Sequence, residues 1–309
     1  MSQRTIVILG AGAWGTTLAT LAKVSGHAVR VWSRGDALQT ALDGADLVFS
    51  AVSMKGVEAV AEQVQHATIA PHTVFVTATK GLAAMSSHDM PLLPSQIWQT
   101  ALPLHPVAVL SGPNLSQEIQ QGLPAATVVA SHDLAAAEVV QATLSSHSFR
   151  IYTNDNVLGV ELGGTLKNVI AIAVGTCDGL QLGTNAKAAL VTRGLAEIIR
   201  VGTYWGAKPE TFYGLSGLGD LLATCNSALS RNYQVGYGLA QGKSLTEVLA
   251  QLKGTAEGVN TTQVLMKLAE QQKIAVPISH QVDRLLKGDI TPQAAVEALM
   301  LRDYKPETP

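Results

Sequence analysis

The first half of the chain alternates short apolar runs with segments in which apolar residues recur at helical spacing. The apolar runs predict strands at residues 5–9, 28–32, 46–52, 73–77, 107–110 and 126–130, with a last edge strand at 149–152. A helix is predicted at residues 16–25, between the first two strands. Such alternation is typical of a parallel sheet with helices on both faces. We therefore expect an α/β fold with a Rossmann-type doubly wound sheet here.

The pattern changes beyond about residue 154, where apolar residues recur every three or four positions, as in Leu162, Leu166, Val169 and Ile170. The second half is therefore predicted to be an all-helical domain. The expected boundary divides the chain into residues 1–154 and 155–309. Candidate helix N-caps precede several helical patterns, and a proline stands at the first helical position after the last of them: Asn185, Ser244, Thr261, Thr291 and Pro292.

Composition narrows the class of protein. Of the 309 residues 47% are apolar and 14% charged, which is enough apolar material for two cores. A net charge of -2 gives no reason to expect nucleic acid or an anionic membrane surface as a binding partner. Cys177 and Cys225 are far apart and fit neither a disulfide framework nor a metal site, so we expect reduced thiols and no metal. The longest uncharged stretch, residues 90–117, contains five prolines and cannot be a membrane-spanning helix. With a strand predicted at the N-terminus in place of a signal peptide, a soluble cytoplasmic protein is expected.

A glycine-rich motif follows the first predicted strand. Gly10, Gly12 and Gly15 form G-x-G-x-x-G between residues 5–9 and the predicted helix at 16–25. In a Rossmann unit the first glycine permits the turn, the second lets the backbone approach a pyrophosphate, and the third allows helix and strand to pack closely. The helix N-terminus then favours the phosphate charge. The alternative is an ordinary glycine-rich turn between strand and helix.

The end of the second predicted strand bears on the choice of cofactor. NAD-binding proteins usually place an acidic residue there for the ribose hydroxyls, whereas NADP-binding proteins place an arginine near the extra phosphate. The chain has Arg34 there, with no acidic residue before Asp36. We therefore favour NADP over NAD. A solvated loop arginine is the alternative for Arg34, and Asp36 remains a candidate ribose ligand.

Three polar groups interrupt the second half. Lys167 lies in an almost uncharged helical segment, so it must be paired or have its pKa lowered by desolvation. Either state suits a residue that donates a proton to a carbonyl. The alternative is a surface lysine whose aliphatic chain packs on the protein while its amine reaches water. Asp220 ends a glycine-rich turn, either as a helix N-cap or as a residue that orients Lys167 or binds a substrate hydroxyl. Ser230, Arg231 and Asn232 combine an N-cap serine, an arginine and an amide, which suits a phosphate.

Taken together, these motifs resemble those of the bacterial-type NAD(P)-dependent glycerol-3-phosphate dehydrogenases, nearly from end to end of the chain. The motifs occur in the family's order: Gly10-x-Gly12-x-Trp14-Gly15-Thr16, Thr79-Lys80-Gly81, Ser111-Gly112-Pro113, Glu161-x-Gly163-Gly164-x-x-Lys167-Asn168, Asn185-x-Lys187-Ala188, Gly217-x-Gly219-Asp220-Leu221-x-x-Thr224-Cys225 and Ser230-Arg231-Asn232.

The resemblance implies reversible hydride transfer between NAD(P)H and dihydroxyacetone phosphate, giving sn-glycerol 3-phosphate for glycerophospholipid synthesis, in a homodimer. It implies Lys167, Asp220 and Lys80 as catalytic residues, with Lys167 exchanging the proton. It implies a dinucleotide-binding domain at 1–154, a substrate and catalytic domain at 155–309, and two sets of binding residues. The cofactor set is Gly10, Gly12, Ala13, Trp14, Gly15, Arg34, Lys80, Ser116, Arg231 and Glu257, and the substrate set is Lys80, Gly112, Asn114, Lys167, Asn168, Asp220, Thr224, Ser230, Arg231 and Asn232.

The chain departs from the family pattern at three places. The segment between Arg34 and Asp46 is short, Val52 is not followed by the usual proline, and Asn114 stands where a small hydroxyl residue is commoner. Two alternatives to the function remain: a related 3-hydroxyacid or 6-phosphogluconate-type dehydrogenase, whose carboxylate substrates match the segment at residues 230–232 poorly, and a non-catalytic NADPH-binding regulator, which predicts a damaged lysine site.

Overall fold

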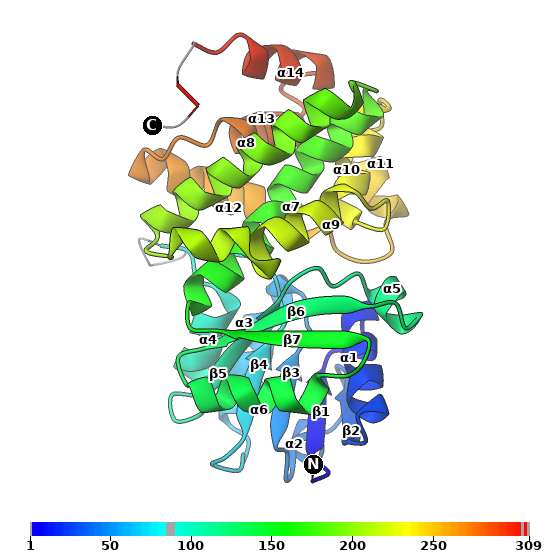
Figure 1. Cartoon of the computed structure of the whole chain (residues 1–309), viewed down its shortest axis with the longest axis vertical. Coiled ribbons are helices and arrows are strands. Elements are labelled where there is room, and N and C mark those ends of the chain that lie inside the picture. The colour runs from blue at the N-terminus through cyan, green and yellow to red at the C-terminus, as the bar shows by residue number, and fades with distance from the viewer. Residues whose placement is uncertain (1, 85–89, 304–305, 308–309) are drawn as a thin grey trace.

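A seven-stranded sheet organises the first half of the chain in the computed structural model, which describes residues 2–84, 90–303 and 306–307 (Figure 1). The strand order is β2-β1-β3-β4-β5-β6-β7. The predicted strands are all present, although the one expected at 46–52 is shorter. The bounds are β1 (Thr5–Leu9), β2 (Ala28–Trp32), β3 (Leu47–Ser50), β4 (Val74–Thr77), β5 (Val107–Ser111), β6 (Ala125–Ser131) and β7 (Phe149–Asn154).

One pair of strands corrects the expectation of a parallel sheet. β6 runs antiparallel to β5, with Ala108 opposite Ser131, while the other neighbouring pairs are parallel. A parallel connection needs a crossover long enough to span the sheet. The β5–β6 connection carries only the five-residue helix α5 (Ser116–Gln120), so the chain turns back beside β5. The sequence pattern shows that a strand is present but not its direction.

Helices cover both faces of this sheet, as the doubly wound prediction requires. Along β1, Ile6 and Ile8 belong to the core under α1 and α6, whereas Val7 and Leu9 belong to the core under α3 and α4. The helix expected at 16–25 begins three residues earlier. The remaining helices of this half are α1 (Ala13–Val24), α2 (Leu38–Leu42), α3 (Met54–Gln65), α4 (Pro94–Ala101) and α6 (Leu134–Leu144).

The second half is helical throughout its described residues, which confirms that prediction (Figure 1). A 3₁₀ turn and a π turn, η1 (Pro209–Tyr213) and η2 (Leu215–Gly219), precede the helix that begins at Asp220. The helices are α7 (Val157–Gly179), α8 (Gly183–Tyr204), α9 (Asp220–Cys225), α10 (Arg231–Ala240), α11 (Leu245–Gln251), α12 (Glu257–Gln272), α13 (Pro277–Lys287) and α14 (Pro292–Met300).

Two of the four expected N-caps are correct. Ser244 and Thr291 each accept a hydrogen bond from the first turn of the helix that follows, and Pro292 is the first residue of α14. Asn185 and Thr261 were wrong, because α8 begins at Gly183 and α12 at Glu257. The early start of α12 has a tertiary cause, since the side-chain oxygen of Asn232 accepts the Gly258 N–H at 2.9 Å.

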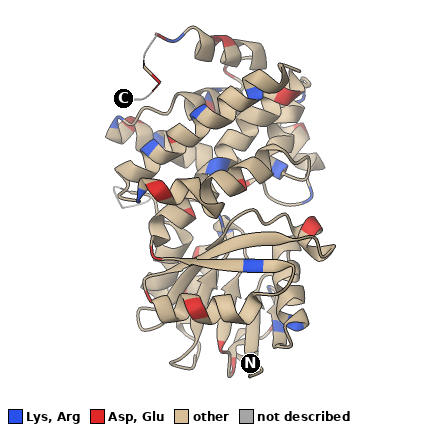
Figure 2. Ribbon diagram, in the orientation of Figure 1, with Lys and Arg blue, Asp and Glu red and all other residues tan. Residues whose placement is uncertain are grey.

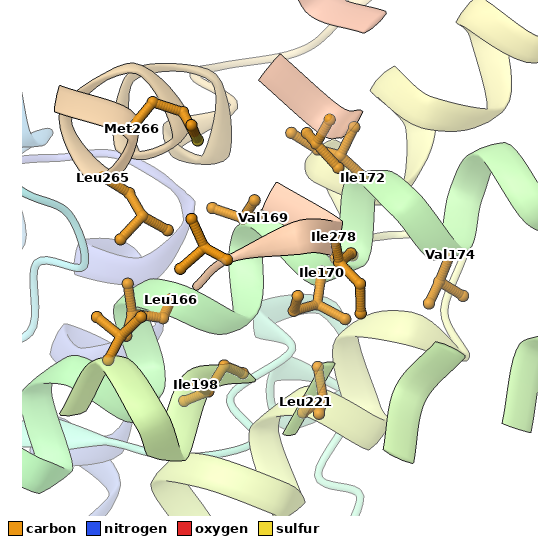
Figure 3. Close-up of a cluster of buried hydrophobic side chains, with 14 of the residues drawn as sticks. Leu166, Val169, Ile170, Ile172, Val174, Ile198, Leu221, Leu265, Met266 and Ile278 are labelled. Atoms are coloured by element: carbon orange, nitrogen blue, oxygen red, sulfur yellow. The ribbon is translucent and has the colours of Figure 1, made fainter. Parts of the chain in front are cut away.

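Helix α7 forms the axis of the second half (Figure 3). Its Leu166, Val169 and Ile170 pack against side chains from α8, α9, α12 and α13, including Ile198, Leu221, Leu265 and Ile278. Within the described residues, α7 is the one helix long and apolar enough to cross a membrane, with a mean hydropathy of 1.6, but 89% of that window is buried inside the protein. This segment is more apolar than residues 90–117, the longest uncharged stretch. Burial among other helices accounts for its apolar character.

Candidate active site

The glycine motif forms a tight turn into the N-terminus of α1. Gly10 has a φ of +110°, and a β-carbon there would lie 3.0 Å from the Ala51 carbonyl oxygen. A β-carbon at Gly15 would lie 1.9 Å from the Gly10 oxygen, so the helix cannot pack on the turn with any larger residue. Gly12 faces open space, with nothing within 4 Å. These are the three properties that a dinucleotide-binding turn needs.

The turn lies where the strand order reverses. The connection that leaves β1 leads to β2 on one side, and the connection that leaves the neighbouring strand β3 leads to β4 on the other side. Such divergence at the carboxyl ends of the strands is where an open α/β sheet has its ligand-binding crevice. The helix begins at Ala13 with Gly12 as its cap, and Gly12 has no side chain to occupy the first-turn N–H groups. Trp14 is half-buried in that turn. The crevice therefore offers N–H donors to an anion.

The turn after β2 places Arg34 at the surface. The Asp36 carboxylate accepts the Ser33 N–H at 2.8 Å, and the Trp32 indole N–H donates to the Asp36 carbonyl at 3.0 Å. The carboxylate of Asp36 is thus engaged within the turn, while Arg34 is exposed. The segment that follows contains only the five residues of α2, in agreement with its expected shortness. This arrangement favours the arginine over the aspartate as a ligand-facing group.

Two lysines and one aspartate meet between the two halves of the chain. Asp220, at the start of α9, pairs with Lys80 Nζ at 2.5 Å and with Lys167 Nζ at 3.1 Å. Lys167 Nζ also donates to Thr224 Oγ1 at 2.5 Å, and Lys80 Nζ to the Gly112 carbonyl at 3.1 Å. The N-cap of α9 is Gly219, so the N-cap interpretation of Asp220 was wrong; its carboxylate lies instead against the Lys167 amine.

Lys167 and Asp220 are buried, Lys80 is half-buried, and the cluster carries one net positive charge. Lys167 is only 6% exposed, so the surface-lysine alternative was wrong. Burial lowers the pKa of Lys167 to about 8; Asp220 opposes this effect, and the charge on Lys80 adds to it. A lysine with such a pKa can both give and accept a proton near neutral pH. The net charge suits an anion or an oxygen on which negative charge develops.

Small residues let α7 reach this cluster. A β-carbon at Gly164 would lie 2.2 Å from Ser111 Oγ and 3.4 Å from Lys80 Cε, and one at Gly163 would lie 2.9 Å from the Ser216 carbonyl oxygen. The hydroxyl of Thr165 accepts the Gly81 N–H at 3.1 Å, which ties the Lys80 segment to the helix that carries Lys167. Sequence reasoning missed Thr165, whose signal was a buried hydroxyl in an apolar helix.

The segment expected to bind phosphate adjoins α7 one residue beyond Lys167. Asn168 Oδ1 accepts from Asn232 Nδ2 at 2.8 Å, and Ser230 caps α10 by accepting the Tyr233 N–H at 3.2 Å. Arg231 is exposed, beside Gly254, where a β-carbon would lie 2.6 Å from Nη1. The first turn of α10 therefore brings an arginine and an amide close to the lysine cluster.

Glu257 links the second half to helix α3 of the first half. Its carboxylate accepts the Met54 N–H at 3.2 Å, at the start of α3, and its neighbourhood includes the Arg231 charge. Burial raises the pKa of Glu257, while the hydrogen bond from Met54 and the charge of Arg231 oppose the rise. Arg231 and Glu257 thus lie together at the junction between the two halves of the chain.

The remaining expected residues follow the C-terminal end of β5 or lie apart from the cluster. Gly112, with a φ of +144°, leaves room for Thr127, whose hydroxyl accepts from Asn114 Nδ2 at 3.0 Å. Asn114 Oδ1 is buried without a partner in the described part of the chain. Ser116 begins α5. Within the same described residues, no hydrogen bond joins Ser116 or Arg34 to the lysine cluster.

Comparison with known proteins decides the family. The family model for the NAD-dependent glycerol-3-phosphate dehydrogenase N-terminus matches residues 5–38 and 35–137, and the model for the C-terminus matches residues 156–297. The chain belongs to the NAD-dependent glycerol-3-phosphate dehydrogenase family. A protein of a Nostoc species named glycerol-3-phosphate dehydrogenase [NAD(P)+] is 65% identical to this chain, and the match covers 99% of both chains. A Synechocystis protein of the same name is 60% identical, and the match covers 98% of this chain and 95% of the relative.

A solved structure supports the fold of this family member over its whole length. The glycerol-3-phosphate dehydrogenase of Coxiella burnetii superposes with a TM-score of 0.91 at 35% identity, covering 97% of this chain and 99% of that one. The Rossmann-type sheet with an all-helical second half is therefore confirmed. The assignment to the glycerol-3-phosphate dehydrogenase family, made from seven motifs, is confirmed as well.

One buried carboxylate in this dehydrogenase had no role in the sequence analysis. Glu161, in α7, accepts both the backbone N–H of Ser95 at 2.9 Å and the Ser95 hydroxyl. Burial raises the pKa of Glu161 to about 7, against the effect of these two hydrogen bonds. The contact fastens α4 of the first half to α7. Glu161 belongs to one of the seven motifs, but its partner Ser95 is 66 residues away, so the sequence did not indicate this contact.

Proposed function

We propose that the chain catalyses reversible hydride transfer between NAD(P)H and dihydroxyacetone phosphate, forming sn-glycerol 3-phosphate. The observation that carries this proposal is the buried Lys80–Asp220–Lys167 cluster, located between a dinucleotide-binding turn and an arginine-bearing helix start. Family membership supplies the substrate and the two cofactors by similarity to the named relatives. We further propose that residues 1–154 bind the cofactor and that 155–309 carry the substrate and catalytic groups.

The residues around the glycine turn fit a dinucleotide. Gly12 leaves open space above the first turn of α1, which a pyrophosphate needs for contact with the backbone. Gly10, Gly12, Ala13, Trp14 and Gly15 would hold that part of the cofactor. When bound, the nicotinamide supplies or accepts the hydride. We assign the extra phosphate of NADP to Arg34, since Asp36 is engaged within its own turn, and further cofactor contacts to Lys80, Ser116, Arg231 and Glu257.

Lys167 is proposed to exchange the proton with the substrate oxygen. Reduction of a carbonyl leaves negative charge on its oxygen, and an ammonium held in place stabilises that charge as the proton moves. Asp220 and Thr224 fix the Lys167 amine, at 3.1 Å and 2.5 Å. Lys80, on the other oxygen of Asp220, adds positive charge and lowers the pKa of Lys167. A lowered pKa makes proton transfer in either direction accessible near neutral pH.

The substrate phosphate is proposed to bind at the start of α10. Arg231 offers a planar pair of donors and the helix N-terminus favours an anion. Asn232 and Asn168 are already hydrogen-bonded to each other, so their positions are fixed before a ligand arrives. Phosphate binding at a distance from the reacting carbon orients it, which can lower the barrier by several kcal/mol. Gly112 and Asn114 would line the opposite wall.

The two alternative functions find less support. A non-catalytic regulator predicts a damaged lysine site, yet Lys80, Lys167 and Asp220 form a complete cluster. A hydroxyacid dehydrogenase predicts groups for a carboxylate, whereas the family model covers the second half as glycerol-3-phosphate dehydrogenase. We also propose that the enzyme is a cytoplasmic homodimer and that its product supplies glycerophospholipid synthesis.

The test of this proposal replaces Lys167 with alanine. We expect Lys167→Ala to lower turnover at least a hundredfold while NADPH still binds, measured by cofactor fluorescence. Lys208→Ala is the matched control, because Lys208 is exposed and pairs with Asp155 at the surface, outside the cluster. Turnover in Lys167→Ala that equals the wild-type rate would overturn the assignment.

A further inference from the structure

A second cavity lies in the helical half, apart from the lysine cluster. It has a volume of about 270 Å³ and is bounded by α7, α8, α13 and α14. Its wall is mostly aliphatic and includes Ala173, Leu190, Val282, Leu285, Ala295 and Leu299. None of the residues proposed to bind cofactor or substrate lines it. The cavity reaches the surface beside Ala189 and Leu182, which are exposed.

Three arginines share this cavity with a single carboxylate. Arg193 and Arg200 come from α8, along which basic residues recur in Figure 2, and Arg302 follows α14. Arg193 and Arg200 donate to the backbone carbonyls of Glu307 at 3.2 Å and of Ala275 at 2.7 Å, and the charge of Arg200 acts to lower the pKa of Glu197. Among the residues that the structure describes, no carboxylate lies within ion-pair distance of any of the three guanidinium groups.

The carboxylate in this cavity is already used by the protein. Glu197 accepts the N–H groups of Ile278 and Ser279, both at 2.9 Å, and the Ser279 hydroxyl at 2.6 Å. It therefore holds the start of α13 and is 2% exposed. The three arginines keep a surplus of positive charge beside an aliphatic wall. An apolar chamber with cationic groups beside it complements a molecule with an apolar chain and an anionic head.

We propose that this cavity binds a single-chain anionic amphiphile, with the chain against the aliphatic wall and the carboxylate or phosphate head at the arginines. A water-sized group occupies about 30 Å³ of liquid, so 270 Å³ accommodates on the order of ten methylene-sized groups. The chain that fits is therefore of medium length, about ten carbons. The two head groups share the chemistry that arginine recognises.

Isothermal titration calorimetry of the purified protein tests the proposal, with every probe below its micelle concentration. Decanoate and decyl phosphate are expected to bind, and decanol and decyltrimethylammonium at least tenfold more weakly. Octanoate, two methylenes shorter, is expected to bind about fifteenfold more weakly than decanoate. The ratio of decanoate to decyl phosphate distinguishes a fatty acid from a phosphate ester as the preferred ligand. Equal binding of the anionic, neutral and cationic probes would overturn the proposal.

Matched variants locate the site. Ala189→Trp should fill the cavity and weaken decanoate binding at least tenfold, whereas Ala188→Trp, at the neighbouring exposed position outside the wall, should leave it unchanged. Arg193→Ala and Arg200→Ala should each weaken decanoate about tenfold and decanol hardly at all. Arg284→Ala is the control for charge, because Arg284 lies on α13 but does not line the cavity. Unchanged binding in both Ala189→Trp and the two lining-arginine variants would refute the site.

A second copy of the chain is the competing occupant of this face. Leu182, Met300 and Leu301 are exposed near the cavity, as an interface would require. Sedimentation velocity of wild type and of the two tryptophan variants separates the cases. If none of the four probes binds and Ala189→Trp alone converts a dimer to a monomer, the cavity belongs to an interface between copies and the proposal fails. These binding and mass measurements do not depend on the enzymatic activity.

Discussion

Replacement of Lys167 by methionine should stabilise the fold while it abolishes activity. Methionine has a similar length and no charge, so the change removes a buried ammonium from the cluster. The pKa of Lys167 falls from its ordinary value of 10.5 to about 8 on folding, mainly because of burial. That fall corresponds to about 3 kcal/mol of free energy by which the protonated lysine destabilises the folded state. Because the pKa already includes the attraction of Asp220, no separate term for that pair is needed.

The stability gain should depend on pH in a defined direction. Below pH 8 lysine is protonated in both the folded and the unfolded chain, so the full cost is present and Lys167→Met gains about 3 kcal/mol in the free energy of unfolding. Between about pH 8 and pH 10.5 the unfolded chain binds more protons than the folded one, so the wild type becomes relatively more stable as pH rises. The advantage of the variant should therefore fade across this range.

Urea denaturation of both proteins at pH 7 and at pH 10.5 measures the effect, with the m-value compared as a check of two-state unfolding. Lys267→Met, at an exposed position in the interior of α12, is the control and should change the free energy by no more than about 0.5 kcal/mol. A variant that is less stable than wild type at pH 7, or a difference that does not change with pH, would refute the reasoning from the buried charge.

Four further predictions concern other parts of the structure. Gly236→Ala should destabilise the protein by more than about 3 kcal/mol in urea denaturation, because the alanine β-carbon would lie 1.8 Å from the Ile172 carbonyl oxygen. A β-carbon at Gly12 meets nothing within 4 Å, so Gly12→Ala should leave the stability of the protein unchanged. The same variant should lose affinity for NADPH in fluorescence titrations. Arg231→Ala should raise the KM for dihydroxyacetone phosphate at least tenfold with a smaller change in kcat, and an unchanged KM would count against it as a phosphate ligand. Arg34→Ala should lower kcat/KM for NADPH at least tenfold and leave that for NADH nearly unchanged, whereas equal losses with both cofactors would contradict its assignment to the extra phosphate.

The sequence predicted the elements of the fold because their signals are local. Alternating apolar runs identified the strands, and helical spacing beyond residue 154 identified the second half. The direction of β6 was not predictable in the same way, since it depends on whether a 13-residue connection crosses the sheet. The start of α12 was misplaced for a similar reason, because its first N–H groups are satisfied by Asn232 of another helix.

In the candidate site, too, local signals were predictable from the sequence and contacts between distant residues were not. Lys167 stood out because a lysine in an apolar helix must be paired or have its pKa lowered, and the structure gives both the pair with Asp220 and the lowered pKa. The sequence did not separate the two roles of Asp220, because both fit an aspartate after glycine. Thr165 and Glu161 were missed, since their partners Gly81 and Ser95 are 84 and 66 residues distant. A polar residue in an apolar helix is the local signal for both, but it does not identify the partner.

The initial rate of cofactor oxidation by the purified protein with dihydroxyacetone phosphate tests the central claim most directly. The assay is run in parallel with NADPH and NADH, and binding of each cofactor is confirmed by fluorescence in the same preparation. The account predicts rapid oxidation that stops when the phosphate group of the substrate is absent, with the higher kcat/KM for NADPH. A folded protein that binds the cofactor and shows no rate with dihydroxyacetone phosphate would contradict it.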